Sequence, residues 1–366
     1  MSEKIRIGYL TTSLASDGGW GRYSKSLAES IASHADVKVL LWKDGPNESR
    51  TLSVDHVLPP FEFSFSTQLK VAWACLRYFR DRDIIHTLVE VYAPGAALAA
   101  WLMRKKFVIT LHGTYSIPPR GFNSQGILLR FAYRVAAHTT TGSFGTAEKV
   151  RATGARLKRC EFIPNGVDDQ VFHYDNLPRE DFFLTVGEIK PRKGADLGVR
   201  ALALLRDEFP SLKYIIVGTY NENQFVETIR SVAREANIED RVEFTGHLSD
   251  DELVSLYNRC RVFLLAARDT GYSFEGFPMV YYEANICGAP VITTKGFGSE
   301  YAIQNGVNGY LVPSNDPGAI AERIRAILID PALQTRLTAC ARRESGKHTW
   351  DAIVPKLMSF YRTARA

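Results

Sequence analysis

The stretch that decides the fold is FFLTVGEIKPRKGADLGVRALALL, residues 182–205. It begins with a short apolar run, passes through a loop with two glycines, and ends in apolar residues at helical spacing. The same succession occurs earlier in RIGYLTTSLASDGGWGRYSKSLAESIA, residues 6–32. A strand, a glycine-bearing loop and a helix in this order open a doubly wound α/β unit. Because the succession occurs twice, the sequence predicts two such units.

Short β-branched and aromatic runs alternate with helical patterns along the whole chain. Several runs are apolar without alternation, as expected of strands that are buried on both faces. This pattern indicates parallel sheets with helices on both faces. The predicted strands are residues 5–10, 37–42, 83–87, 106–112, 182–187, 213–218, 241–246, 262–267, 290–294 and 308–312.

The division into domains follows from a break in this pattern. Residues 162–181 are rich in Pro, Asn and Asp and have no helical periodicity. We therefore expect a Rossmann-like domain over residues 1–170 and a second over 171–347, with a ligand cleft between them at the carboxyl ends of the strands. Residues 348–366 have the apolar spacing of a helix, which Pro355 should bend or interrupt. Ser249 and Glu252 predict a helix capping box.

Composition restricts the class of protein. The 366 residues exceed one ordinary core, and the five cysteines are scattered, so we expect buried reduced thiols rather than disulfides or zinc ligands. The N-terminal residues lead straight into a strand-like run, which argues against a signal peptide. The longest apolar run, residues 91–103, contains Pro94 and Gly95 and is too short to span a bilayer. The expected location is cytoplasmic.

The charge is distributed unevenly. Residues 1–170 contain 22 Lys and Arg against 15 Asp and Glu, a net +7, whereas the remainder has 23 against 25, a net −2. Either this is ordinary surface variation, or the first half has an anionic partner such as a phospholipid surface or a phosphate-bearing acceptor. The excess is modest and no aromatic-basic module accompanies it, so nucleic-acid binding has little support.

One segment of the basic half has a pattern of its own. In residues 120–137, Arg130 and Arg134 are four apart and share a helical face. A helix of this kind either rests on the inner face of an anionic membrane or is an ordinary domain helix with two exposed arginines. The apolar residues available for burial are Ile127, Leu128, Phe131 and Val135.

Two glutamates mark a second conspicuous stretch, GYSFEGFPMVYYEANICGAPVI, residues 271–292. Proline suits the first helical turn, so the sequence predicts a helix from Pro278 onward. Glu275 then lies in the preceding loop, and Glu283 lies on the helix among apolar neighbours. The amides of Phe277, Met279 and Val280 would point out of the helix N-terminus and, with its dipole, favour a diphosphate.

With GFPMV between the glutamates and ANICGAPVI after them, this stretch resembles glycosyltransferase family 4, retaining nucleotide-sugar transferases of the GT-B fold. The resemblance covers almost the whole chain. Further matching segments, in the family's order, are DGGWG at 17–21, LHGT around His112, IPNGVD at 163–168, VGEIKPRKG at 186–194, FTGHLS at 244–249 and GVNGYLV at 306–312. The family implies two Rossmann-like domains facing across a cleft, with the last helix returning to the first domain.

In the first half the resemblance assigns roles to three residues. Gly18 and Gly19 would let the backbone approach the donor phosphates and the reacting sugar, where a side chain would clash. Taken alone, paired glycines are also typical of an ordinary strand-to-helix turn. His112 matches the histidine that contacts the donor sugar, although a lone histidine often has a structural role.

In the second half the resemblance assigns Lys193 to the donor diphosphate, Glu275 to sugar hydroxyls and Glu283 to the nucleotide ribose. Backbone around Gly246, His247 and Leu248 would contact the base. Further donor contacts are implied for the segment Gly276, Phe277, Pro278, Met279 and Val280. A solvated loop lysine and an exposed helix are the alternatives for Lys193 and for the glutamates.

The sequence departs from the family pattern at two positions. Glu188 stands where the family usually has a phosphate-gripping arginine, and a carboxylate there would repel a diphosphate. We expect Arg192 to supply the missing charge, with Lys190 as the alternative. Many relatives have glycine where Pro278 stands, and proline offers no N–H to the sugar.

The expected reaction is transfer of a hexose-type sugar from a nucleoside-diphosphate sugar to the hydroxyl of a glycan, lipid-linked or small-molecule acceptor. Cations and a helix terminus would stabilise the leaving phosphate, so neither a metal nor another cofactor is expected. Retention would proceed by same-face attack, with the leaving phosphate taking the acceptor's proton. The alternatives are a nucleotide-sugar epimerase and a non-catalytic sugar-nucleotide binding protein.

Overall fold

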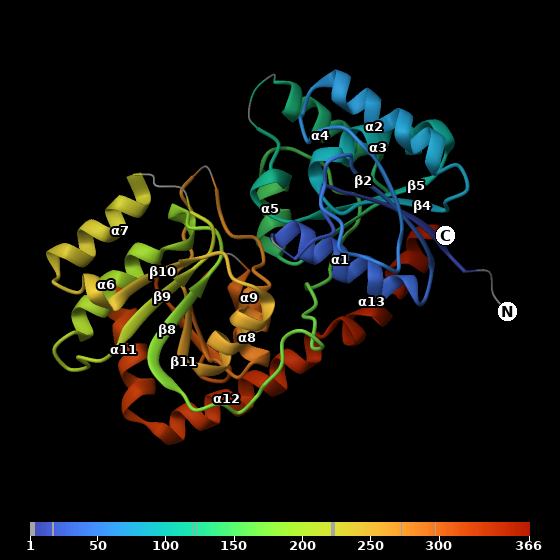
Figure 1. Ribbon diagram of the computed structural model, residues 1–366. Coiled ribbons are helices and arrows are strands. Elements are labelled where there is room, and N and C mark those ends of the chain that lie inside the picture. The colour runs from blue at the N-terminus through green and yellow to red at the C-terminus, as the bar shows by residue number, and fades with distance from the viewer. Residues whose placement is uncertain are drawn as a thin grey trace. The chain divides into compact units, whose positions relative to one another are not determined.

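The computed structural model describes residues 4–16, 18–119, 121, 123–220, 224–271, 273–296 and 298–366. By their contacts, the residues divide into two compact units (Figure 1). The first unit is Met1–Gly166 with Trp350–Ala366, and the second is Val167–Thr349. The chain therefore leaves the first unit once and returns to it for its last helix.

The first unit contains, in its described part, a seven-stranded parallel sheet in the order β3-β2-β1-β4-β5-β6-β7. The order reverses at β1, which is the topological switch point of a doubly wound sheet. The strands are β1 Arg6–Thr11, β2 Asp36–Trp42, β3 Ser53–Leu58, β4 Ile84–Thr87, β5 Lys106–Leu111, β6 His138–Thr141 and β7 Cys160–Phe162. Of these, β3, β6 and β7 were not predicted from the sequence.

The helices of the first unit complete a doubly wound arrangement (Figure 1). They are α1 Gly19–Ala32, α2 Phe65–Tyr78, α3 Ala93–Met103, α4 Ser124–Val135, α5 Phe144–Ala152 and α13 Trp350–Arg365, with the 3₁₀ turns η1 Glu90–Tyr92 and η2 Thr114–Ser116. The central helix α3 is almost wholly apolar and packs between α2 and α4.

The last helix, α13, packs on α1, β4 and β5, so its predicted return to the first domain is confirmed. Its Tyr361 hydroxyl lies 2.9 Å from the Tyr9 hydroxyl and 2.8 Å from His86 Nδ1, all in the buried interior. Pro355 lies inside this helix, which continues without interruption from Trp350 to Arg365, so of the two predicted effects interruption does not occur. The apolar face formed by Ile353 and its neighbours is buried, and this packing offsets the hydrogen bond that proline cannot make.

The second unit is also doubly wound. Its described residues form a six-stranded parallel sheet in the order β10-β9-β8-β11-β12-β13. The strands are β8 Glu180–Val186, β9 Lys213–Val217, β10 Val242–Gly246, β11 Cys260–Leu265, β12 Val291–Thr294 and β13 Gly309–Val312. All six lie where the sequence predicts a strand, within about two residues at each end.

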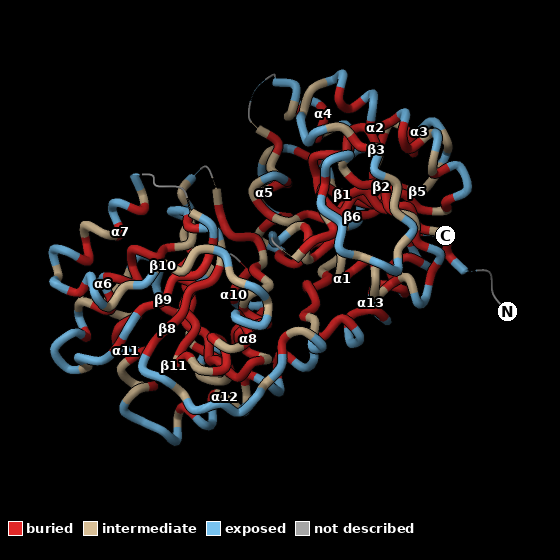
Figure 2. Tube along the Cα trace, viewed as in Figure 1, coloured by how far each residue is buried: buried red, intermediate tan, exposed pale blue. Residues whose placement is uncertain are grey.

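The helices of the second unit are α6 Ala195–Leu205, α7 Gln224–Glu235, α8 Asp250–Arg259, α9 Val280–Ile286, α10 Ser299–Ala302, α11 Pro317–Ile329 and α12 Pro331–Ser345. The 3₁₀ turns are η3 Pro191–Lys193, η4 Glu239–Arg241 and η5 Gly346–His348. The capping box before α8 is confirmed, because Ser249 accepts from the Glu252 N–H and Glu252 accepts from the Ser249 N–H. Figure 2 shows buried residues concentrated along the strands of each sheet.

Two further sequence predictions concern the cysteines and the apolar segments. Among the described residues the cysteines are free, but Cys160 and Cys340 are only partly buried, which corrects the expectation of five buried thiols. In the part of the chain that the structure covers, every helix is too short or too polar to traverse a bilayer.

Candidate active site

A cluster of three charged side chains lies at the carboxyl end of the second sheet. Arg192 and Lys193 come from η3, the turn after β8, and Glu275 comes from the loop after β11. Arg192 Nε lies 2.7 Å and Lys193 Nζ 3.5 Å from the same oxygen, Glu275 Oε1. The fold thus joins residues that are more than 80 positions apart in the chain. Their combined formal charge is +1.

Two glycines, Gly187 and Gly194, lie in the loop that carries Arg192 and Lys193. A Cβ on Gly187 would lie 3.0 Å from Lys193 Nζ, and the φ of Gly187 is +130°, which side-chain-bearing residues rarely adopt. A Cβ on Gly194, directly after η3, would lie 2.0 Å from the carbonyl oxygen of Ala266. Both glycines are therefore required where they stand, one beside the lysine and one against the neighbouring strand.

Glu275 is only 7% exposed although it carries a carboxylate. Neither cation approaches its Oε1 in hydrogen-bond geometry, so this oxygen is buried without a hydrogen-bond donor from the residues described. Ion pairs with Arg192 and Lys193 compensate its charge, and a carboxylate oxygen can accept further hydrogen bonds beside them. Such an acceptor is expected where a ligand completes the site.

Lys190 and Arg192, the two candidates to replace the arginine that the family has at position 188, have different surroundings. Lys190 Nζ lies 2.8 Å from Glu188 Oε2, and both side chains are about half exposed. The Glu188 carboxylate is therefore paired with Lys190. Arg192, in contrast, lies beside Lys193 at Glu275.

The helix that follows Glu275 begins later than predicted. α9 starts at Val280, with Met279 as its N-cap, and Pro278 lies outside it. The N–H groups of Tyr282 and Glu283 both donate to the Met279 carbonyl, at 2.9 and 3.1 Å, so the helical pattern starts there. Phe277 consequently precedes the helix terminus, and its amide does not belong to the first turn. Gly276 and Pro278 are buried in the preceding loop.

Glu283 is 4% exposed on α9, and its Oε2 accepts a hydrogen bond of 3.2 Å from the hydroxyl of Tyr257 on α8. Asn285, two residues further on, fixes the same helix to the loop before β13. Asn308 Nδ2 donates to Asn285 Oδ1 at 2.8 Å and to the Ala302 carbonyl at 2.9 Å. The position of Glu283 therefore depends on a buried polar network behind its helix.

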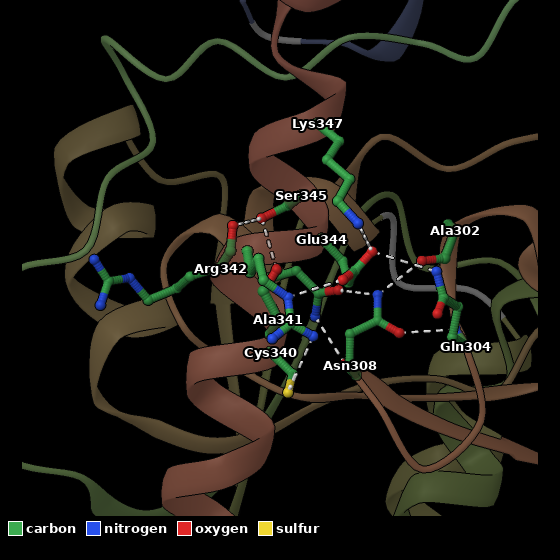
Figure 3. A network of polar contacts seen from close by, with 11 residues as sticks. Ala302, Gln304, Asn308, Cys340, Ala341, Arg342, Glu344, Ser345 and Lys347 are labelled. Atoms are coloured by element: carbon green, nitrogen blue, oxygen red, sulfur yellow. Dashed lines mark hydrogen bonds and ion pairs between the residues drawn. The ribbon is translucent and has the colours of Figure 1, made fainter.

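That network extends to α12 (Figure 3). The Gln304 N–H donates to Asn308 Oδ1 at 2.7 Å, and Gln304 Nε2 lies 3.4 Å from Glu344 Oε2. Lys347 Nζ donates to the same carboxylate oxygen at 2.6 Å. The GVNGYLV segment that matched the family pattern is thus a structural connector between α9 and α12.

The segment predicted to contact the base follows β10. Gly246 has φ +75°, its carbonyl accepts from the Gly218 N–H at 2.8 Å, and a Cβ there would meet no atom within 4 Å. His247 is exposed, and Leu248 packs against the core. The structure leaves this backbone open on one side.

His112 lies at the carboxyl end of the first sheet, directly after β5, and is partly exposed. Its ring nitrogen Nε2 lies 2.6 Å from the Leu88 carbonyl, which only accepts, so Nε2 carries a hydrogen. The ring also contacts Tyr23 edge-on, with centroids 4.6 Å apart. These contacts fix the imidazole in one orientation.

Sequence reasoning missed the residue that holds His112. Glu90, in η1, is completely buried, and its Oε1 accepts from the His112 N–H at 2.7 Å and from the Ser116 hydroxyl. Its Oε2 has no hydrogen-bond partner among the residues described. The available signal was a single carboxylate in the apolar run LVEVYAPGAALAA, residues 88–100.

The glycine pair of the first loop is placed differently from the glycines near Lys193. Gly18 is the N-cap of α1 and Gly19 is its first residue; neither has a positive φ, and a Cβ on either would meet no atom within 4 Å. The fold itself therefore does not require glycine at these two positions. Asp17, the first residue of this motif, lies outside the described residues.

The basic segment 120–137 forms α4, although Arg120 and Phe122 lie outside the described residues. Arg134 is exposed, whereas the Arg130 guanidinium reaches the carbonyls of Pro119 and Thr153. Leu128 is buried as expected. Ile127 and Phe131, also named as available for burial, are exposed in this unit.

A cavity of about 540 Å³ lies next to the charged cluster. It is lined by the loop Glu188–Pro191, by Thr219 and Tyr220 after β9, and by Gln224, Phe225 and Thr228 of α7. None of the three charged residues of the cluster lines it, although Pro191 of η3 does.

Two family models match the chain in succession. The model for glycosyltransferase family 4 matches residues 17–171, and the model for glycosyl transferases group 1 matches residues 168–344. Together they span both units, and the second match contains Arg192, Lys193 and both glutamates.

Curated relatives agree with these matches. A GDP-mannose-dependent alpha-(1-6)-phosphatidylinositol monomannoside mannosyltransferase of Mycobacterium tuberculosis is 28% identical over 216 residues, 55% of this chain and 55% of that protein. The protein of the same name from Mycolicibacterium smegmatis is 29% identical over 329 residues, 81% of each chain. The match to the first of these thus spans about half of that relative's length.

Among solved structures, Anabaena HepE in complex with UDP and glucose has a TM-score of 0.81 at 21% identity, covering 98% of this chain and 100% of that one. At this identity the likeness concerns the fold. The fold is GT-B, with two Rossmann-like parallel-sheet units, as the sequence predicted.

Proposed function

Because the chain belongs to the glycosyltransferases, we propose that it transfers a hexose from a nucleoside-diphosphate sugar to an acceptor hydroxyl with retention of configuration. The observation that carries this proposal is the cluster of Glu275, Arg192 and Lys193. A buried acceptor oxygen suits sugar hydroxyls, and two adjacent cations suit a diphosphate. A sugar nucleotide presents these two groups side by side.

In the proposed reaction, the bond between the anomeric carbon and the donor phosphate oxygen breaks while the acceptor oxygen bonds to that carbon on the same face. The acceptor proton passes to the departing phosphate oxygen, so no protein base is needed. Negative charge grows on that oxygen, and Lys193 and Arg192 stabilise it. Glu275 holds ring hydroxyls and keeps the two cations in place before the donor binds.

We propose the remaining donor contacts from the family pattern. Glu283 accepts from the ribose, backbone at Gly246, His247 and Leu248 meets the base, and backbone at Met279 and Val280 meets the diphosphate. In the first unit, His112 contacts the sugar. Gly18 and Gly19 admit the donor, and the absence of any fold reason for glycine at these positions supports this role.

The acceptor is a glycan, a lipid-linked sugar or a small molecule, and the relatives named for phosphatidylinositol mannoside synthesis favour a glycolipid. We further propose that transfer requires no metal or other cofactor, because cations of the chain itself face the diphosphate. The proposed location is cytoplasmic, with the basic first unit on the inner face of a membrane.

The first experiment is a thermal-stabilisation screen of the purified chain with GDP-, UDP- and ADP-sugars, with GDP-mannose included because relatives use it. The best donor is then assayed for transfer with and without EDTA. Glu275→Ala should lose turnover far more than donor affinity. If no sugar nucleotide stabilises the chain, or if Glu275→Ala turns over like the wild type, the proposal fails.

The stereochemistry needs a separate measurement. Nuclear magnetic resonance of the product should show the anomeric configuration of the donor. Mass spectrometry of the enzyme during turnover should find no glycosyl adduct. A covalent adduct on Glu275 would replace same-face attack by double displacement.

A further inference from the structure

Two pairs of aromatic rings lie at the carboxyl end of the first sheet. Trp20 and Tyr23 come from the start of α1, and His112 and Tyr115 follow β5. Trp20 contacts Tyr115 edge-on with ring centroids 5.0 Å apart, and Tyr23 contacts His112 at 4.6 Å. Tyr23 is buried, whereas Tyr115 is 52% exposed and Trp20 is partly exposed. We call Trp20 and Tyr115 the outer aromatic pair.

The outer aromatic pair is carried by backbone that is fixed in place. Tyr115 is the middle residue of η2. The next residue, Ser116, accepts at its carbonyl from the Tyr133 hydroxyl at 2.5 Å, and its own hydroxyl donates to the buried Glu90. Trp20 is the second residue of α1 and packs partly on the core. Rings that are already held in one orientation lose little entropy when a ligand binds.

The outer aromatic pair lies next to the histidine that the proposed reaction uses. Trp20 and Tyr23 are three residues apart on α1, which is about 4.5 Å along the helix axis. This spacing is close to the length of one sugar ring, so a ring on the outer pair reaches His112 with its edge. Gly18 and Gly19 are exposed, and a Cβ on either would meet no atom within 4 Å, so the approach over the first loop is open.

Both cations of α1 are already engaged. Lys25 forms an ion pair with Glu48 at 2.9 Å, and the N–H and hydroxyl of Ser16 donate to the same carboxylate. Arg22 Nη2 donates to the Ser16 carbonyl at 2.9 Å. A phosphate would have to displace one of these contacts to gain a cation, whereas an uncharged ring would not. The described surroundings therefore favour a neutral ligand.

We propose that the outer aromatic pair is the acceptor subsite, and that it binds the uncharged hexopyranose ring whose hydroxyl receives the transferred sugar. The C–H groups on one face of a pyranose are slightly positive and the face of an aromatic ring is slightly negative, so the two stack. The exposed ring of Tyr115 offers this contact, and Trp20 holds that ring from the side. This inference rests on the proposed sugar transfer and commits it to a sugar as acceptor.

The first test is saturation-transfer nuclear magnetic resonance of the full chain, with the nucleoside diphosphate of the stabilising donor bound. The probes are the methyl glycopyranosides of mannose, glucose and galactose, with inositol 1-phosphate as the charged contrast. We expect saturation of the ring C–H protons of at least one glycoside. Tyr115→Ala should weaken its binding about 10-fold. Tyr115→Phe keeps the ring and should bind normally, whereas Tyr115→Leu should behave like Tyr115→Ala because it is apolar without an aromatic face.

Steady-state kinetics with the bound glycoside as acceptor separate stacking from a general structural loss. Tyr115→Ala should raise the acceptor KM about 10-fold and leave kcat and the donor KM within about twofold of the wild type. Hydrolysis of the donor by water should also be unchanged, because it needs no sugar acceptor. Tyr301→Ala is the matched control, since Tyr301 is a 40% exposed tyrosine of α10 in the second unit. It should match the wild type in every measurement.

The failure of this inference can be told apart from the failure of the proposed function. If a sugar nucleotide stabilises the chain but no glycoside binds, or if inositol 1-phosphate binds in their place, the acceptor subsite is wrong while the donor chemistry stands. Normal glycoside binding by Tyr115→Ala would also overturn it. Loss of donor stabilisation in Tyr115→Ala would assign the outer aromatic pair to the donor instead. If no sugar nucleotide stabilises the chain, the proposed function fails and this inference fails with it.

Discussion

Glu275 and Glu90 are both buried carboxylates near the carboxyl end of a parallel sheet, but they have opposite surroundings. Glu275 in the second unit faces Arg192 and Lys193. Glu90 in the first unit has only neutral donors among its described contacts, the His112 N–H and the Ser116 hydroxyl. At the edge of the second sheet, two cations face the single carboxylate of Glu275, so the net charge is positive. At the edge of the first sheet, the described contacts of the Glu90 carboxylate are hydrogen bonds from neutral groups.

This difference indicates that the two carboxylates have different roles, one in binding an anion and one in holding the backbone. A net positive cluster attracts an anion, so the second unit has the electrostatics for a diphosphate. A carboxylate held by neutral donors instead fixes the backbone around His112 and Ser116. The comparison therefore predicts electrostatic losses from substitutions in the second unit, and positional or stability losses from substitutions in the first.

The largest expected effect concerns Lys193. Lys193→Ala should lower kcat by about 10²–10³-fold, because it removes a charge-assisted donor to the leaving phosphate. Steady-state kinetics with saturating donor measure this loss. Lys190→Ala is the matched control, since Lys190 pairs with Glu188, and its rate should change less than about twofold. Equal losses in the two variants would contradict the assignment of charges.

The next effect separates charge from hydrogen bonding at Glu90. Glu90→Ala removes the acceptor of two buried donors and should lower the free energy of unfolding by about 1–3 kcal/mol for each. Glu90→Gln keeps an acceptor oxygen and should recover most of this loss. Urea denaturation measures both variants. If Glu90→Gln were as unstable as Glu90→Ala, the negative charge itself would matter and the comparison would fail.

A third effect tests the buried interior of the first unit. Burial lowers the pKa of His86 to about 3, so the unfolded chain binds a proton near pH 6.5 that the folded chain binds only near pH 3. Stability should therefore fall as pH drops below about 6.5, by roughly 2 kcal/mol between pH 7 and pH 5. Urea denaturation at several pH values measures the slope. His86→Gln should flatten it, and an unchanged slope would assign the proton to another group.

The smallest effect concerns the first loop. Gly19→Ala should leave stability nearly unchanged, because a Cβ there meets no atom within 4 Å, but it should weaken donor binding by about 1 kcal/mol through overcrowding. Gly21→Ala is the contrasting variant, since its Cβ would lie 2.4 Å from the Ala15 carbonyl oxygen and should destabilise the fold. Calorimetry with the donor distinguishes the two, and normal binding by Gly19→Ala would remove this loop from the site.

Much of the fold could be predicted because most strands are continuous apolar runs. The exceptions are strands β3, β6 and β7. β6 consists of HTTT, and β7 has only the three residues CEF. Neither shows a hydrophobic pattern, and both become strands because the sheet beside them supplies hydrogen bonds. The start of α9 was missed because the proline rule places Pro278 in the first turn, whereas Met279 provides the first helical carbonyl.

The candidate site was predictable where its chemistry is local in sequence. Arg192 and Lys193 are adjacent, and Glu275 lies in a motif of recognisable spacing. Glu90 was not predictable in its role, because the role depends on β4 and β5 lying side by side and on a contact across 22 residues.

The Asn308 network has a consequence for the reversibility of thermal unfolding. Asn308 is followed by Gly309, and an asparagine before glycine loses its amide readily once the chain is unfolded and flexible. The product, an aspartate, has no N–H to give to Asn285 or to the Ala302 carbonyl, so it places a carboxylate against two oxygen acceptors. Each episode of heating would thus leave a fraction of molecules unable to refold, and thermal inactivation would become progressively irreversible.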